Sequence, residues 1–215
     1  AAAAGVAAVV VSRAPRVAIV STGSELVEPG TPLGRGQIPD SNGVLLAALA
    51  VEAGAVVVHR GAIDDEGSSL RALLVELDDV DAIVFSGGVS AGAYEVVRTE
   101  LADAMTFVRV AMQPGKPQGF GRLPGGALLF GLPGNPVSSA VSFETFVRPA
   151  LLAMQGRVGG ARPRVHLPAA AAWTTPPGRR QYLPAVVDRS DPARWTVAPA
   201  TAGGSGSHLA GGLGR

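Results

Sequence analysis

Short runs of consecutive apolar residues alternate along this chain with longer segments whose apolar residues recur every three or four positions. The runs lie at residues 17–20, 55–58, 82–85 and 127–130, and a similar segment at 107–110 contains one charged residue, Arg109. A short, continuous apolar run is typical of a strand that is covered on both faces. The pattern therefore predicts five strands within the first 130 residues, and the run that ends at Phe85 is typical of a buried parallel strand.

Helical patterns lie between and after these runs. The first helix follows N-cap residues at 40–42 and ends before Gly54, which suits the position after a helix. The second has its apolar stripe at Leu70, Leu73, Leu74 and Leu77. The third covers about residues 94–102, and the fourth covers residues 137–154. Alternating strands and helices predict βαβ units, so the expected fold is a three-layer α/β/α domain with a mainly parallel sheet.

The character of the sequence changes after Gln155. Residues 156–164 are rich in Gly and Arg, which is typical of a linker. Short strand patterns follow at residues 165–167, 182–187 and 195–198, and they predict a small all-β C-terminal domain. The expected division is residues 1–14 as the tail of an upstream domain, residues 15–155 as the α/β domain and residues 163–215 as a β-barrel-like domain.

Composition limits the classes of function. Of the 215 residues, 47% are hydrophobic and 16% are charged, which is enough apolar material for a sizeable core. A formal net charge of +1 argues against a protein that binds nucleic acid through bulk charge. The chain has no cysteine, which excludes disulfides and thiolate metal sites and fits a cytoplasmic location. The apolar stretch at residues 1–11 is shorter than the roughly 20 residues of a membrane span.

The loops that follow parallel strands meet at one edge of a sheet, and ligands bind there. This brings residues 21–25, 64–66, 86–95 and 131–139 to one rim, with Lys116 on a neighbouring loop. Adjacent glycines at 87 and 88 let the backbone turn and approach a ligand. Unpaired N–H groups at the start of the following helix favour phosphate or carboxylate. A plain strand-to-helix turn is the alternative that a single Gly-Gly pair leaves open.

Acidic side chains share this rim. Glu25, Asp65 and Glu95 are hard oxygen donors, which suit Mg²⁺ bound together with a substrate phosphate. Asp64, Asp65 and Glu66 also precede a helix, so N-capping and dipole compensation are an alternative explanation. The three histidines are scattered and show no ligand spacing. Because the P-loop, dinucleotide-binding and nucleophile-elbow motifs are missing, the residues alone indicate an α/β protein that binds a phosphorylated small molecule.

Four motifs, taken in order, resemble a known family. They are STGSEL at residues 21–26, SGGVS at 86–90, PGKP at 114–117 and GLPGNPVS at 131–138. In this order and spacing they resemble the molybdopterin molybdenumtransferases, the molybdenum insertases of the MoeA type that include the gephyrin E domain. The resemblance covers residues 15–155 well and the terminal module more loosely.

The resemblance implies an enzyme of molybdenum cofactor biosynthesis. Such enzymes receive adenylated molybdopterin from a molybdopterin adenylyltransferase, insert molybdate with the help of Mg²⁺ and release AMP. They are homodimers that carry two further domains before the segment found here, so this chain is expected to be a C-terminal piece with part of the active site missing. The implied partners are small molecules rather than nucleic acid or a membrane.

The resemblance also assigns roles by position. It implies catalytic roles for Glu25, Asp65, Glu95 and Lys116, of which Asp65 and Glu25 are also the expected metal ligands. It implies contacts to molybdopterin from Thr22, Gly23, Ser86, Gly87, Gly88, Ser90, Arg109, Gly134, Asn135, Pro136, Ser138 and Ser207. Asp64 or Glu66 takes the place of Asp65 if the alignment slips by one. Glu95 stands where many members have Asp, and Arg109 where many have Lys.

Two other functions stay open at this point. The related molybdopterin adenylyltransferases share the Ser/Thr-Gly-Gly fold but have a single domain, whereas a GLPGNP segment followed by a β module favours the insertase. A non-catalytic scaffold like gephyrin in receptor clustering would bind peptides through the terminal domain, and nothing in the sequence indicates this. The preference between molybdate and tungstate is also left open.

Overall fold

A six-stranded sheet in the order β4-β1-β5-β9-β8-β6 forms the centre of the computed structural model, which describes residues 2–89, 95–157 and 159–200. The strands are β1 (Arg16–Thr22), β4 (Val56–Ile63), β5 (Ala82–Ser86), β6 (Met105–Arg109), β8 (Pro117–Arg122) and β9 (Leu128–Leu132). The four strands from β4 to β9 run parallel, and β8 is antiparallel to both of its neighbours. The mainly parallel sheet expected from the apolar runs is confirmed.

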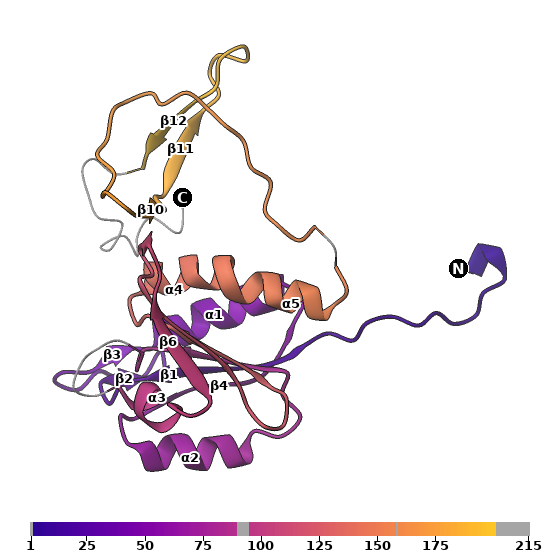
Figure 1. Cartoon of the computed structure of the whole chain (residues 1–215), viewed down its shortest axis with the longest axis vertical. Coiled ribbons are helices and arrows are strands. Elements are labelled where there is room, and N and C mark those ends of the chain that lie inside the picture. Colours follow the sequence, from indigo (N-terminus) through magenta and orange to yellow (C-terminus); the bar gives the residue numbers. More distant parts are fainter. Residues whose placement is uncertain (1, 90–94, 158, 201–215) are drawn as a thin grey trace.

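Helices cover both faces of this sheet (Figure 1). The helical elements are α1 (Ser41–Glu52), α2 (Gly67–Glu76), α3 (Val96–Glu100), α4 (Pro136–Ser142), the π-helical segment η2 (Phe143–Val147) and α5 (Arg148–Met154). The helices α1, α4 and α5 lie on one face, while α2 and α3 lie on the other. The expected three-layer α/β/α architecture is therefore confirmed.

Alternate residues of each central strand point into two separate cores. In β1, Val17 and Ile19 join the apolar cluster under α1 and α5, and Ala18 and Val20 join the cluster under α2 and α3. All four side chains are fully buried. Consecutive residues of each strand therefore point to opposite sides of the sheet. The same alternation determines on which side the polar residues at the strand ends lie.

Helix boundaries differ from the prediction where special residues intervene. The first helix is capped as expected, since the Asp40 carboxylate accepts a hydrogen bond from the N–H of Gly43. The third helix is only a single turn in the described residues. The fourth predicted helix is continuous, but five of its residues are π-helical, and the N–H of Arg148 donates to Phe143 five residues earlier. Pro149 has no N–H and cannot donate a helical hydrogen bond. The π-helical segment η2 thus ends one residue before Arg148–Pro149, where the regular hydrogen-bond pattern is interrupted.

The strand β8 was not predicted. Its residues include two glycines and a leading proline, PQGFGR, which is a poor strand pattern on propensity alone. A side chain at Gly121 would collide with the backbone of Ala104 and Met105, and one at Gly119 with the Phe107 ring. Pairing with β6 thus brings chain segments so close together that only glycine fits, which is a tertiary effect that the local sequence does not show.

The chain after α5 carries short strands, as expected, at partly different positions. These are β10 (Arg180–Gln181), β11 (Ala185–Asp188) and β12 (Thr196–Pro199), of which β11 and β12 form an antiparallel pair. The strand predicted at residues 165–167 is wrong, and the one predicted at 182–187 begins only at Ala185. In the described part of the chain, no fully buried apolar side chain lies beyond Leu152. The absence of a local apolar core explains why single-sequence patterns placed these strands poorly.

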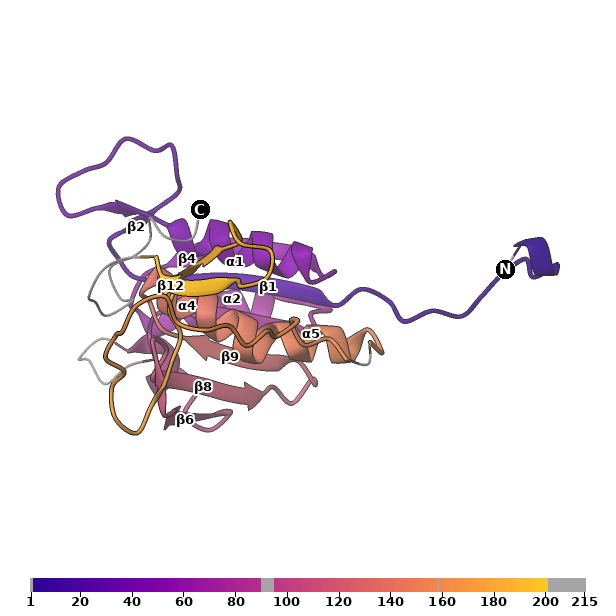
Figure 2. The same ribbon diagram turned by 90° about the horizontal axis from the view of Figure 1, so that it is seen from above.

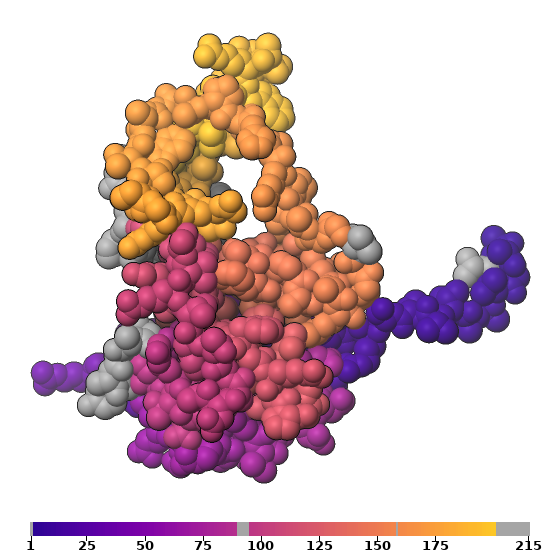
Figure 3. Space-filling model, viewed as in Figure 1, coloured from indigo at the N-terminus to yellow at the C-terminus, as the bar shows by residue number. Residues whose placement is uncertain are grey.

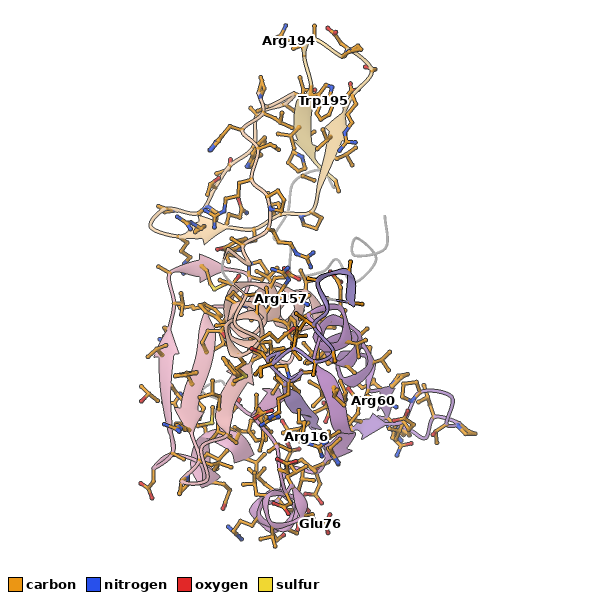
Figure 4. All side chains as sticks on the ribbon, turned by 90° about the vertical axis from the view of Figure 1, so that its right-hand side faces the viewer. Arg16, Arg60, Glu76, Arg157, Arg194 and Trp195 are labelled. Carbon is orange, nitrogen blue, oxygen red and sulfur yellow. The ribbon has the colours of Figure 1, made fainter. Side chains whose placement is uncertain are left out.

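This C-terminal part contacts the α/β domain through β10, which pairs with β7 (Met112–Gln113). The space-filling view shows the segment after α5 leaving the helices to join the C-terminal part, with an opening between this segment and that part (Figure 3). Trp195 lies at the end of the module far from the sheet, where the Arg189 guanidinium stacks 4.7 Å from its ring centre (Figure 4). The domain boundaries predicted at 155 and 163 remain predictions.

Two segments project from the α/β domain. The short strands β2 (Leu26–Val27) and β3 (Ile38–Pro39) bound an exposed loop. The N-terminal segment, which begins with the 3₁₀ turn η1 (Ala2–Ala4), extends away from the sheet (Figure 2). It is anchored where Arg13 makes two hydrogen bonds of 2.6 Å to Asp81. None of the helices in the described ranges is both long enough and apolar enough to cross a membrane.

An ion-pair network fixes the start of the C-terminal part to the helices. Arg162 donates to Glu144 in η2 and to Glu52 in α1, both at 2.7 Å. The hydrogen bond from Arg162 holds the pKa of Glu144 below its ordinary value. Since the folded protein then binds the Glu144 proton less tightly than the unfolded chain, the stabilisation is present above the usual carboxyl pKa of about 4.3 and is lost as the pH falls below it.

We expect Arg162→Met to lower the free energy of unfolding by about 0.5–1 kcal/mol at pH 7, because the pairs are partly exposed to solvent. Urea titrations of both proteins at pH 7 and pH 3 measure this. The difference should shrink at pH 3, and a difference that is independent of pH would show that the ion pairs do not stabilise the fold. Arg164→Met, a substitution of a nearby exposed arginine in the same segment, is the matched control.

Candidate functional site

A cleft of about 380 Å³ opens at the carboxyl ends of β1, β5 and β9. This is the edge at which the loops after parallel strands were expected to meet. The cleft is lined by Thr22, Gly23, Glu25, Asp65, Gly87, Gly88, Val89, Glu95, Pro117, Pro133 and Gly134. Loops that are distant in sequence, after β1, β4, β5 and β9, are thereby brought to one place.

The Gly87–Gly88 turn forms the floor of this cleft. Both glycines have positive φ, +93° and +64°. A Cβ on Gly87 would lie 2.8 Å from Thr22 Oγ1 and 3.0 Å from the Thr22 carbonyl oxygen, and a Cβ on Gly88 would lie 2.9 Å from the same hydroxyl. Glycine is therefore required at both positions for conformation and for space.

Thr22 presents an unusual polar group to this floor. The residue is 8% exposed, and its hydroxyl is buried. Oγ1 has no hydrogen-bond partner among the residues that the structure describes. A buried hydroxyl without a partner costs free energy, so its place in a ligand-sized cleft points to a bound oxygen or nitrogen atom as its partner.

Asp65 is held in the cleft by the loop after β1. Its Oδ2 accepts hydrogen bonds from the N–H and the hydroxyl of Ser24, both at 3.1 Å. The neighbouring acids make local contacts, since Asp64 accepts from the N–H of Glu66, and Glu66 accepts from the Ser68 hydroxyl at 3.5 Å. Among the three acids that the sequence left open, Asp65 is the one that lines the cleft.

The charge of the lining is negative in the described residues. Glu25, Asp65 and Glu95 contribute carboxylates, and no Lys or Arg is among the lining residues. The Glu25 carboxylate lies against the backbone of Gly23. A Cβ added to Gly23 would be 2.6 Å from Glu25 Oε2. No group of three or more His, Cys, Asp or Glu side chains in residues 2–89, 95–157 and 159–200 converges on a metal position. An anionic ligand in this cleft needs a cation or a nearby base to offset the carboxylates.

Several predicted site residues lie outside the cleft lining. Lys116 and Arg109 are exposed on the neighbouring loop and at the end of β6. The side chain of Ser86 is buried beneath the cleft, where its Oγ accepts from Asn42. Asn135, followed by Pro136 at the first turn, caps α4 by accepting from the N–H groups of Val137 and Ser138. Ser90 and Ser207 lie outside the described residues.

Residues to which the sequence assigned no role at the site also shape the cleft. Ser24 fixes Asp65, and Asn42 binds both Ser86 and the carbonyl of Gly134. Pro117 and Pro133 contribute apolar walls. Asn42 was recognised as part of an N-cap sequence, but its contacts span 44 and 92 residues along the chain, so the local pattern contained no signal for them.

A three-layer α/β domain with a polar cleft at the carboxyl ends of its parallel strands defines a domain that binds a small polar molecule. Residues 18–153 match the family model described as "Probable molybdopterin binding domain". The chain belongs to this family.

Curated relatives agree with the resemblance seen in the four motifs. The chain is 46% identical over 197 residues to "Molybdopterin molybdenumtransferase 2" of Mycobacterium tuberculosis, a match that covers 87% of this chain and 48% of that protein. It is 35% identical over 207 residues to "Molybdopterin molybdenumtransferase 1" of the same organism. The expected resemblance to the molybdenumtransferases is confirmed, and the chain spans about half the length of the curated relatives it matches.

A solved structure is similar as well. The MoeA protein of molybdopterin biosynthesis from Pyrococcus horikoshii superposes with a TM-score of 0.58 at 37% identity, over 66% of this chain and 36% of that one.

Proposed function

We propose that the chain binds molybdopterin and takes part in inserting molybdate into it, as a molybdopterin molybdenumtransferase does. The observation that carries this proposal is the floor of the cleft, where the buried Thr22 hydroxyl lies beside two glycines in a domain of the molybdopterin-binding family. Glycine allows the backbone to approach a ligand closely, and the hydroxyl beside the two glycines is a donor that a phosphate oxygen could accept from. We assign the terminal phosphate of molybdopterin to this position.

The acidic lining suits a cation bound together with that phosphate. Mg²⁺ takes oxygen ligands, retains waters and is often held by only one or two carboxylates plus substrate phosphate, so a site without three converging acids fits it. Asp65 and Glu25 are the proposed ligands, and the ion would neutralise charge and orient the phosphate. The Ser24 hydrogen bonds keep Asp65 in place before the ion binds.

Molybdate is an anion, and so the same carboxylates would repel it in the absence of a cation. Lys116 and Arg109, on elements that border the cleft, are the proposed basic groups that attract it. Glu95 is the third acidic residue of the lining and is proposed to act with Asp65. The release of AMP, a homodimeric assembly, an adenylyltransferase as donor and a cytoplasmic location belong to the same proposal and rest on the family resemblance.

The substitution Thr22→Val tests the proposed phosphate position. Valine has the same shape but no hydroxyl, and Thr22 Oγ1 makes no hydrogen bond among the described residues, so the free energy of unfolding should stay the same or rise. The affinity for molybdopterin should fall about tenfold, as expected for one lost hydrogen bond to a charged group. A pterin fluorescence titration measures the affinity.

Thr22→Ser is the control, because it keeps the hydroxyl, and its affinity should stay close to that of the unsubstituted chain. If Thr22→Val binds molybdopterin as tightly as Thr22→Ser, the phosphate does not lie at this hydroxyl. If the unsubstituted chain does not bind molybdopterin at all, the proposed function is wrong.

A further inference from the structure

Asn42 lies on α1, outside the cleft lining, and contacts two of the loops that form the cleft. Its Nδ2 donates to Ser86 Oγ at 2.7 Å and to the carbonyl oxygen of Gly134 at 2.7 Å. A carbonyl oxygen only accepts hydrogen bonds, and this fixes the orientation of the Asn42 amide. Ser86 directly precedes Gly87, so one side chain joins both glycine-bearing loops of the cleft.

The contact continues as a buried polar network. Ser86 Oγ lies 3.4 Å from Ser139 Oγ, and the Ser139 hydroxyl donates to the carbonyl oxygen of Pro133. Ser86 is 2% exposed and Ser139 is fully buried. The carbonyl groups of both Pro133 and Gly134, residues that line the cleft, are therefore held from beneath by hydrogen bonds that reach back to α1.

The two loops meet where this network holds them. A Cβ on Gly134 would lie 3.6 Å from the Cα of Gly87, which is ordinary van der Waals contact. The N–H of Gly87 also donates to the carbonyl oxygen of Leu132 at 3.0 Å. The Gly87 backbone is therefore already hydrogen-bonded to the end of β9, and only about the width of a methyl group separates it from Gly134. Loss of the Asn42 donors would therefore allow the two loops to move apart.

We propose that Asn42 is a positioning residue that sets the separation of the Gly87–Gly88 turn and the Pro133–Gly134 turn, and thereby the affinity of the cleft for its ligand. The identity of the ligand, molybdopterin, rests on the proposed function. The Asn42 Oδ1 is buried and has no partner among the described residues. The two N–H donors are therefore the contribution of this side chain, and a carboxylate of the same shape would not replace them.

Two substitutions test this role. Asn42→Ala removes the donors, and Asn42→Asp puts a charged acceptor against the carbonyl oxygen of Gly134, which can only accept. We expect molybdopterin affinity to fall about tenfold in Asn42→Ala and further in Asn42→Asp, since a net hydrogen bond corresponds to about a factor of ten. When cofactor formation is assayed in the complete protein of which this chain is expected to be a piece, KM for the pterin substrate should rise with little change in kcat, because Asn42 touches no reacting atom.

Hydrogen exchange provides a readout that needs no ligand. In Asn42→Ala the backbone N–H groups of Gly87 and Ser139 should exchange at least about fivefold faster than in the unsubstituted chain, as expected for a locally loosened loop. Ser41→Ala, at an exposed neighbouring position of α1, is the matched control and should leave both affinity and exchange unchanged.

The outcomes are distinct. An Asn42→Ala affinity within twofold of the unsubstituted chain overturns the inference, and so does an equal loss in Ser41→Ala. If the unsubstituted chain binds no molybdopterin, the proposed function fails while exchange still decides on Asn42. Faster exchange at Gly87 and Ser139 then supports the positioning role, and unchanged exchange overturns it.

Discussion

Replacing Gly87 by valine is expected to abolish molybdopterin binding, with an affinity loss of roughly 100-fold or more, equivalent to about 2.8 kcal/mol. The valine Cβ would lie 2.8 Å from Thr22 Oγ1 and would displace the hydroxyl to which the proposal assigns the phosphate. The backbone at φ +93° is also strained for valine, so the free energy of unfolding should fall by about 1–3 kcal/mol. Titration with molybdopterin and urea denaturation measure the two effects separately.

The chain offers a closely matched control at Gly30. Its φ is +94°, but a Cβ there would meet nothing within 4 Å. Gly30→Val should therefore show a similar backbone strain without any effect on the cleft. If Gly87→Val binds molybdopterin as well as Gly30→Val does, the ligand does not approach the Gly87 backbone.

Substitution of Asp65 by asparagine is expected to reduce molybdenum insertion by about 100-fold, while molybdopterin affinity changes less than about threefold. The size is typical for loss of one electrostatic contact that acts in the transition state. The amide oxygen of asparagine still accepts a hydrogen bond from Ser24, so the loop after β1 stays in place. The measurement, made in the complete protein of which this chain is expected to be a piece, is the rate of cofactor formation from adenylated molybdopterin, molybdate and Mg²⁺, beside a binding titration.

Asp64→Asn is the control for this experiment. Asp64 is the adjacent carboxylate in sequence, yet it accepts from the N–H of Glu66 and does not line the cleft. It should retain insertion activity within about threefold. Parallel losses of binding and insertion in Asp65→Asn would point to a role in ligand binding or folding instead. A large loss in Asp64→Asn would show that the wrong acid has been assigned.

Much of the α/β domain follows from local sequence. The strands β1 and β5 have both faces covered, so their sequences are continuous apolar runs that can be recognised locally. Asp40 caps α1 by accepting from the N–H of Gly43, only three residues away. The strand β8 was missed, because its glycines are explained only by the neighbouring chain segments. The strands after residue 160 were partly misplaced, since no fully buried apolar side chain in the described part of that region imposes a pattern.

The site shows the same division. Gly87, Gly88, Thr22 and Asp65 follow strands whose carboxyl ends share an edge, and this topology brought them together as predicted. Ser86 also lies at the end of a parallel strand, but its side chain points away from the cleft. It is buried on the face of the sheet that α1 covers, where it accepts a hydrogen bond from Asn42. Successive residues at the end of a strand point to opposite faces of the sheet, so only some of them face the cleft. The prediction from motifs assigned every motif residue to the ligand and therefore included Ser86.

The alternation at the ends of β1 and β5 has a consequence for changes in chain length. Ser21 donates to Asp40 at the start of α1, whereas its neighbour Thr22 faces Gly87 and Gly88 on the other side of the sheet. Deleting or inserting a single residue within β1 would exchange these two environments, putting a serine at the cleft or a threonine in the tightly packed interior. Two-residue changes would preserve the facing but shift the strand end by one pleat. We therefore expect insertions and deletions to be tolerated in loops such as residues 28–37 and not within β1. An odd or even change in the number of residues in β1 decides which side chain faces the cleft, so the length of this strand matters as much as the identity of its side chains.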